Sequence, residues 1–189
     1  MKLDLINENF PIWEVTSWDF PDINFDNLYL NKFDQSSKTY ESSELRQYVH
    51  EFPFFNKLKI RFLEQGKIIE EMLRKSDLPL LDRMWKGRLK TLNWPNDDLV
   101  TLVDKPGFEM ADHTDNRFVL GVLIINLIDN PQGSSTNFPM LKYSSPTEKG
   151  TGVFFLNHDN TLHSIKQPGP ENRIISYQIL TIDSLKENV

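Results

Sequence analysis

The stretch that decides the fold is residues 108–128, FEMADHTDNRFVLGVLIINLI. It contains two runs with strand character, Phe108–His113 and Val119–Ile128, separated by a short polar segment. The strongly apolar run from Phe118 to Ile128 is interrupted by Asn126 and is too short to cross a bilayer. The stretch therefore predicts two strands of a β-rich domain, not a membrane span.

The same strand character continues toward both ends of the second half of the chain. Further candidate strands are Leu99–Val103, Thr136–Leu141, Gly152–Asn157, Leu162–Lys166 and Arg173–Ile182. Turn signals rich in proline, glycine and asparagine separate them. Many short, closely spaced strands are typical of a sandwich or barrel, with the jelly roll among the options.

The first half of the chain has a different character. Apolar residues recur at helical spacing between Phe54 and Lys75, and Asp77 could cap a second helix that runs to about Leu89. Residues 1 to about 40 read as irregular, apart from a possible strand over Pro11–Trp18. We expect one domain over 1–189, with a helical or irregular support region at 1–97 and a β core at 98–182. The helices would cover one face of the sheet.

The composition limits the chemistry that the chain can perform. The 189 residues include no cysteine, so any metal must bind through His, Asp or Glu. The net charge of −6 argues against sequence-independent binding to duplex nucleic acid, although it does not exclude a local basic groove. The first ten residues lack the pattern of a signal peptide, which favours a cytoplasmic protein with no membrane association. The oligomeric state is not readable.

The segment Ala111–Asp115 carries the first candidate metal ligands. Residues two apart on a strand face the same side, so His113 and Asp115 would present an imidazole and a carboxylate together. A second imidazole from a neighbouring strand would complete two His and one carboxylate, a set that suits Fe(II) and leaves coordination positions open. His163, at the start of a predicted strand, is preferred for this role, and His158, in a turn, is the alternative.

Arg173 opens the last predicted strand, ten positions after His163. An arginine among apolar residues needs an anionic partner, because an unpaired buried charge is costly. Its planar guanidinium can bind a carboxylate through two hydrogen bonds. A dicarboxylate that binds the metal at one end and Arg173 at the other would meet this need.

In order and spacing these residues resemble the Fe(II)/2-oxoglutarate-dependent oxygenase superfamily, and its prolyl-hydroxylase-like branch above all. That branch has a His-x-Asp motif, a distal His and a basic residue about ten positions later. The segments Gly133–Pro139 and Lys149–Phe155 are similar to its Gly-Gly-x-Thr-x-Phe-Pro and Lys-Gly-x-Ala-Val-Phe-Phe strands. The resemblance covers roughly residues 98–182 and implies a double-stranded β-helix, that is, a jelly-roll barrel with helices outside.

The resemblance also implies roles for individual residues. His113, Asp115 and His163 would be the catalytic metal ligands for Fe(II), and Arg173 would bind the distal carboxylate of the co-substrate 2-oxoglutarate. Ser176 could assist Arg173, although its spacing is one residue longer than in relatives. Asn126 lies near the position of a tyrosine that binds the co-substrate in relatives; it could act similarly or pair with backbone.

The activity that follows from the resemblance is a dioxygenase that uses O2 and 2-oxoglutarate and releases succinate and CO2. The retained carboxylate of Asp115 favours hydroxylation of a C–H bond, with desaturation and demethylation still open. Prolyl hydroxylases carry Lys where this chain has Arg173, so a prolyl substrate does not follow, and a small molecule or a peptide remains possible. The alternatives are a cupin-like metal enzyme, or a binding module, that does not use 2-oxoglutarate.

Overall fold

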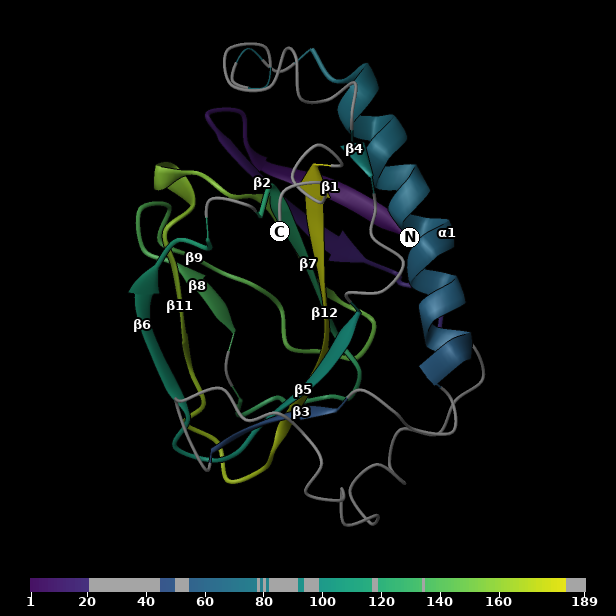
Figure 1. The fold of residues 1–189 in the computed structure, drawn as a ribbon. Helices are drawn as coiled ribbons and strands as arrows, with labels where there is room; N and C mark the ends of the chain where they lie inside the picture. The colour runs from purple at the N-terminus through teal and green to yellow at the C-terminus, as the bar shows by residue number, and fades with distance from the viewer. Residues whose placement is uncertain are drawn as a thin grey trace.

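Two antiparallel sheets pack face to face in the computed structural model, and one long helix covers the outer face of the larger sheet (Figure 1). The structure describes residues 1–20, 45–49, 55–77, 79, 81, 92–93, 99–116, 119–133 and 135–182. In this part of the chain, no helix is long and apolar enough to span a membrane.

The larger sheet has eight strands and contains both N-terminal and C-terminal segments. Its strands, in spatial order, are β1 (Lys2–Asn7), β2 (Phe10–Thr16), β10 (Gly152–Leu156), β7 (Gly121–Asn126), β12 (Arg173–Ile182), β5 (Val100–Asp104) and β3 (Arg46–Val49), and β4 (Leu92–Asn93) also pairs with β12. The register places Arg173 and Arg46 on either side of Asp104.

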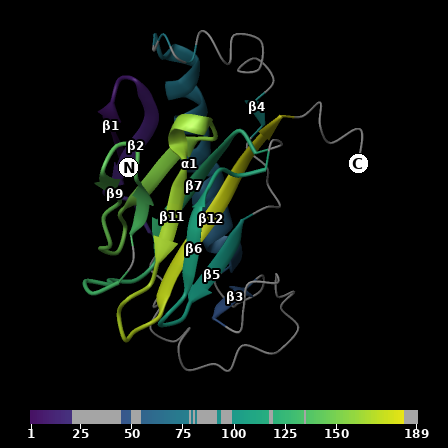
Figure 2. The same ribbon diagram turned by 90° about the vertical axis from the view of Figure 1, so that its left-hand side faces the viewer.

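The smaller sheet has four strands and faces the larger one, as Figure 2 shows from the side. Its strands, in spatial order, are β6 (Glu109–His113), β11 (His163–Lys166), β8 (Thr136–Phe138) and β9 (Tyr143–Ser144). From β5 to β8 the chain alternates between the two sheets, and β10, β11 and β12 do the same. This alternation is the winding of a double-stranded β-helix, so the expected architecture is confirmed.

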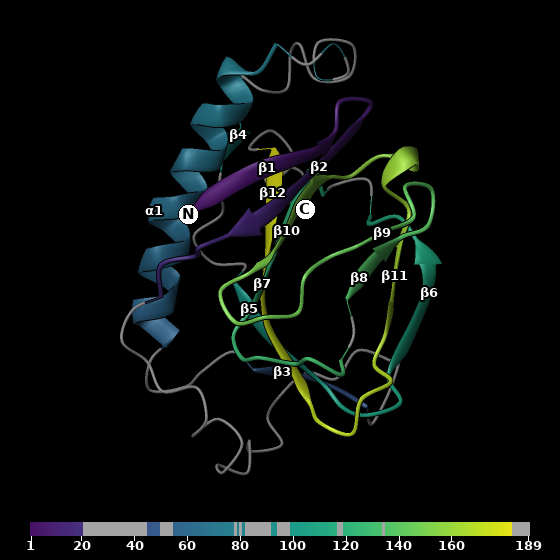
Figure 3. The same cartoon turned by 180° about the vertical axis from the view of Figure 1, so that it is seen from behind.

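Helix α1 (Phe55–Lys75) packs on the outer face of the larger sheet, as the view from behind in Figure 3 shows. Leu58, Phe62, Ile69 and Leu73 line its inner side and are fully buried. Their spacings of four and seven residues place them on one face of the helix. The outer side is charged, with the ion pair Lys75–Glu71 near its end. The predicted helix over 54–75 is therefore found almost as expected.

A second apolar cluster lies between the two sheets. Alternation along each strand sends one set of side chains outward to α1 and the other inward. On β7, for example, Leu123 and Ile125 belong to the outer cluster, while Val122 and Ile124 belong to the inner one. The inner cluster also includes Phe138 of the smaller sheet. This inner cluster fills part of the space between the two sheets. The space that it does not fill is a pocket.

The seven predicted strands of the second half agree with the structure to within three residues at each end. The possible strand over Pro11–Trp18 is found as β2, but the irregular reading of the residues before it was wrong, because Lys2–Asn7 form β1. The two strands make a hairpin that extends the larger sheet through pairing of β2 with β10. The turn at Asn7–Asn9 is closed by a hydrogen bond from the Asn9 amide to the Asn7 side chain. The second expected helix, 77–89, lies mostly outside the described residues.

Candidate metal centre

His113 and His163 lie directly opposite each other on neighbouring strands of the smaller sheet. His113 is the last residue of β6 and His163 the first of β11, and the antiparallel register pairs them. Their ring centroids are 4.3 Å apart. Residues 50 positions apart in the sequence are thus held side by side by strand pairing.

Hydrogen bonds to backbone carbonyls fix the orientation of both imidazoles. Nδ1 of His113 lies 2.9 Å from the Ala111 carbonyl oxygen, and Nδ1 of His163 lies 3.0 Å from that of Thr161. Because a carbonyl oxygen only accepts, Nδ1 carries the hydrogen in each neutral ring. Nε2 of each ring therefore keeps its lone pair for a metal.

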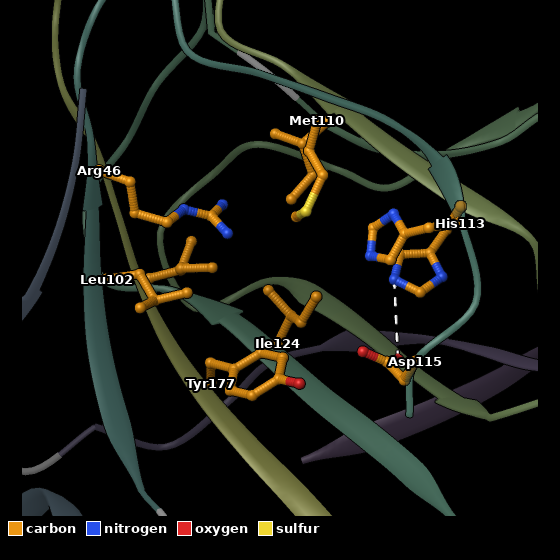
Figure 4. Close-up of a pocket in the computed structure, with 10 residues that line it drawn as sticks. Arg46, Leu102, Met110, His113, Asp115, Ile124 and Tyr177 are labelled. Atoms are coloured by element: carbon orange, nitrogen blue, oxygen red, sulfur yellow. Dashed lines mark ion pairs between the residues drawn. The ribbon is translucent and has the colours of Figure 1, made fainter. Parts of the chain in front are cut away.

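Asp115 supplies the third donor. Strand β6 ends at His113, so Asp115 follows the strand and does not lie on it as the sequence predicted. Its Oδ2 still lies 3.7 Å from Nε2 of His163 (Figure 4). One ligand atom from each of His113, Asp115 and His163 lies within 4.8 Å of the other two.

Burial shifts the pKa values of two groups in this cluster, Asp115 and His163. Burial raises the pKa of Asp115, whereas the two imidazoles and a hydrogen bond from Tyr177 lower it. Burial also lowers the pKa of His163, which keeps that ring neutral. Oδ2 of Asp115 is buried without a hydrogen-bond partner among the described residues. Two imidazole nitrogens and a carboxylate oxygen without a hydrogen-bond partner are a donor set that fits a divalent ion such as Fe(II).

The three donors line a pocket of about 180 Å³ between the two sheets. The pocket is smaller than the ~300–1,000 Å³ typical of drug-sized sites, so it suits a small ligand. Apolar side chains form most of its wall, together with two polar groups, Arg46 and Tyr177. The apolar members are Leu102, Met110, Ile124, Ile165 and Ile175.

His158, the alternative third ligand, lies elsewhere. It precedes a short 3-10 turn, η3 (Asp159–Thr161), and its Nδ1 accepts a hydrogen bond from the Asn160 amide. In the described part of the chain it does not belong to the cluster of potential ligands around His163. The structure therefore brings together the preferred set, whose role in metal binding remains a prediction.

Arg173 already has an anionic partner within the protein. Its side chain is 2% exposed and donates to Oδ2 of Asp104 at 3.1 Å and to Oγ1 of Thr136 at 3.2 Å. The sequence argument that a buried arginine requires a carboxylate was sound, but Asp104 supplies that carboxylate. Among the described residues, Arg173 does not line the pocket.

The two other residues expected at the co-substrate site face elsewhere. The Asn126 amide group donates to the carbonyl oxygens of Pro146 at 2.8 Å and Thr151 at 3.2 Å, so of its two possible roles the structure shows pairing with backbone. Ser176 lies between Ile175 and Tyr177, which line the pocket, and alternation turns its side chain to the opposite face of β12. Neither Asn126 nor Ser176 is among the residues that line the pocket.

Sequence reasoning missed Arg46 and Tyr177 in the pocket wall. Arg46 lies in a segment where no element was predicted, so nothing in the sequence linked it to the site. Tyr177 is four positions after Arg173 on the same predicted strand, and even spacing places both on the inner face. That signal was available for Tyr177 but not for Arg46.

Asn157 holds the segment that carries Asp115. Its Nδ2 lies 3.0–3.1 Å from the carbonyl oxygens of Asp115, Asn116 and Val119, and its Oδ1 accepts from the Asp115 amide at 3.2 Å. Asn157 follows the end of β10, so one side chain ties the segment after β6 to the larger sheet. It is a positioning residue for the predicted metal ligand Asp115.

Asn157→Ala should weaken Fe(II) binding by about 10- to 100-fold, the usual effect of removing a residue that orients a metal ligand. Titration of the purified variant with Fe(II) under anaerobic conditions measures this. Asn137→Ala is the matched control, because among the described residues the Asn137 side chain bonds to Ser135 and Ser144 and not to the segment that carries Asp115. Equal iron affinity in both variants would show that Asn157 does not position Asp115.

Comparison with solved structures identifies proteins of the same fold. A viral collagen prolyl hydroxylase from Paramecium bursaria Chlorella virus-1, in complex with 2-oxoglutarate, superposes with a TM-score of 0.62 at 18% identity. The match covers 94% of this chain and 98% of that one. A Pseudomonas putida prolyl-4-hydroxylase gives a TM-score of 0.58 at 11% identity, with 92% and 93% covered.

A further similar structure is the non-haem α-ketoglutarate-dependent epimerase SnoN from nogalamycin biosynthesis. Its TM-score is 0.52 at 14% identity, with 92% of this chain and 78% of that one covered. No family model and no curated protein matches the sequence. The fold is therefore that of 2-oxoglutarate-dependent oxygenases.

Proposed function

We propose that this chain is an Fe(II)- and 2-oxoglutarate-dependent dioxygenase that hydroxylates a C–H bond of a small molecule or peptide. The observation that carries the proposal is the cluster of His113, Asp115 and His163, whose donor atoms line one pocket of this fold. The solved structures of similar fold include hydroxylases and an epimerase, two of which are described with 2-oxoglutarate or α-ketoglutarate, and this supports the reaction class.

The reaction would combine the substrate R–H, O2 and 2-oxoglutarate and yield R–OH, succinate and CO2. Decarboxylation of 2-oxoglutarate provides two electrons, and iron supplies the activation of O2 when it is bound. Nε2 of each imidazole and the Asp115 carboxylate would hold the metal. Two protein nitrogens and one carboxylate leave other coordination positions free for the co-substrate and O2.

The remaining pocket residues would bind and shield the reactants. Leu102, Ile124 and Ile175 are apolar residues that line the pocket, and they would limit the access of water to the reactants. Tyr177 bonds Asp115, which helps to keep the carboxylate ionised and aimed at the metal. Arg46 places a positive charge on the wall, where an anionic co-substrate group can bind.

One observation keeps a second candidate open. Asp104 already forms an ion pair with both Arg46 and Arg173. Each arginine therefore has an anionic partner even when no ligand carboxylate is bound. A cupin-like metal enzyme that binds a different ligand would show the same metal cluster. Dependence of turnover on 2-oxoglutarate separates the two functions.

The purified protein with Fe(II), ascorbate and 2-oxoglutarate is expected to consume O2 and form succinate. A panel of prolyl peptides, other peptides, free amino acids and nucleobases should include a substrate that accelerates this reaction. His113→Ala should lower succinate formation at least ~100-fold, because it removes a ligand and not merely a group that orients one. Absence of metal-dependent succinate formation across the panel would refute the proposal.

A further inference from the structure

Three charged residues form a row across neighbouring strands at one end of the pocket. Asp104 of β5 is the register partner of Arg46 on β3 and of Arg173 on β12. Oδ2 of Asp104 accepts from a terminal nitrogen of Arg46 at 2.9 Å and of Arg173 at 3.1 Å, and Nε of Arg46 also bonds Oδ1. One carboxylate is thus shared by two guanidinium groups.

The row of Arg46, Asp104 and Arg173 is buried and contains more positive than negative charge. The side chains of Arg46, Asp104 and Arg173 are 7%, 0% and 2% exposed. Two arginines and one aspartate leave a net charge of +1, which is costly to bury without a further anion. Nε of Arg173 also lacks a hydrogen-bond partner among the described residues. The row is therefore electrostatically suited to one additional carboxylate.

Only one member of the row reaches the pocket in the described structure. Arg46 lines it, whereas Asp104 and Arg173 are not among its lining residues. Figure 4 shows the Arg46 guanidinium directed into the pocket from the side opposite His113. The guanidinium carbon also lies 4.0 Å from the centre of the Phe108 ring, which supports the group on one face.

We infer that Arg46, and not Arg173, binds the far carboxylate of the co-substrate directly. Asp104 orients the Arg46 guanidinium through two hydrogen bonds, and Arg173 contributes positive charge through its own bond to Asp104. This assignment rests on the proposed function. It gives a role in the site to a residue of the N-terminal half, outside the strands that carry the metal ligands.

Binding of two oxoacids to the Mn(II)-loaded protein tests the inference without turnover. 2-Oxoglutarate and 2-oxopentanoate have the same carbon chain, but the second has a methyl group in place of the far carboxylate. Calorimetry under identical conditions gives the ratio of their affinities. Charge-assisted hydrogen bonds to the far carboxylate should make wild type prefer 2-oxoglutarate at least ~10-fold.

Arg46→Met should bring this ratio close to one by weakening 2-oxoglutarate alone, with 2-oxopentanoate affected less than ~3-fold. Asp104 keeps its pairing with Arg173 in this variant, which favours folding. The control Arg61→Met removes a partly exposed arginine of α1 that pairs with Asp19 and Glu64, and it should leave the ratio unchanged. Melting curves verify that each variant is folded.

If Arg46→Met prefers 2-oxoglutarate over 2-oxopentanoate as strongly as the wild type does, the assignment of Arg46 is overturned and the proposed function is left intact. Failure of wild type to bind either oxoacid with Mn(II) would overturn both. If Arg46→Met does not fold, Arg46→Lys decides. That variant keeps the charge but loses the planar fork, so the ratio should fall at least ~3-fold, and an unchanged ratio contradicts the inference.

Discussion

His163→Ala is expected to abolish Fe(II) binding, with at least a ~100-fold loss of affinity, whereas His158→Ala should bind iron as the wild type does. His163 is one of the three clustered donors and is nearly fully buried, and among the described residues His158 does not belong to the cluster. His158 instead caps a 3-10 turn. The two variants thus separate a metal ligand from a histidine only five positions away.

Packing makes a second substitution necessary at this position. The His163 ring lies 4.6 Å from that of Phe155 and 5.9 Å from that of Phe138, so alanine also leaves a cavity. His163→Gln keeps more of the side-chain volume and should show the same loss of iron binding.

His158→Ala should lower the free energy of unfolding by ~0.5–2 kcal/mol through loss of the cap, with its iron affinity retained. Anaerobic Fe(II) titration and melting curves provide both quantities. Tight iron binding by folded His163→Gln would contradict the assignment.

Asp104→Asn is expected to destabilise the fold by about 3–5 kcal/mol, because it leaves two buried arginines without their shared counterion. Asp104 is fully buried and accepts from both Arg46 and Arg173. The asparagine side chain has an NH2 group where Asp104 has its second oxygen. This group is a donor and would face the guanidinium donors, so at least one of the present hydrogen bonds is lost. The same change should weaken 2-oxoglutarate binding, because Arg46 loses the group that orients it.

Urea unfolding followed by circular dichroism measures this effect as a shift of the midpoint. Asp4→Asn is the matched control, since Asp4 pairs with Lys2 on the surface and such pairs contribute only ~0–1 kcal/mol. A loss below ~1 kcal/mol in Asp104→Asn would show that the row of charges is not the buried, mutually dependent network described above.

The sequence predicted the elements whose signal is local and strong. Strand β7 is almost wholly apolar, and β12 and α1 carry long patterns with the expected periods. The pairing of His113 with His163 followed from two strands that had each been recognised. Strand β1 was missed because its signal is the short alternation of Lys2–Leu5, which the polar residues around it obscured.

The partners of Arg173 could not be predicted in the same way. Asp104 lies 69 positions before Arg173 and 58 after Arg46, and only the register of three strands brings them together. Nothing local distinguishes Arg46 from other arginines of the first half. The sequence thus revealed the need for an anion at Arg173, but the identity of that anion depends on long-range topology.

A crystal structure of the protein with Mn(II) and 2-oxoglutarate, grown without O2, tests the central claim most directly. The account predicts one metal ion bound by Nε2 of His113, Nε2 of His163 and a carboxylate oxygen of Asp115, at about 2.0–2.2 Å as is usual for such ligands. The 2-oxoacid end of the ligand should bind the metal and the far carboxylate should meet Arg46. A metal bound elsewhere, or His163 turned away from it while the ion is present, would contradict the account.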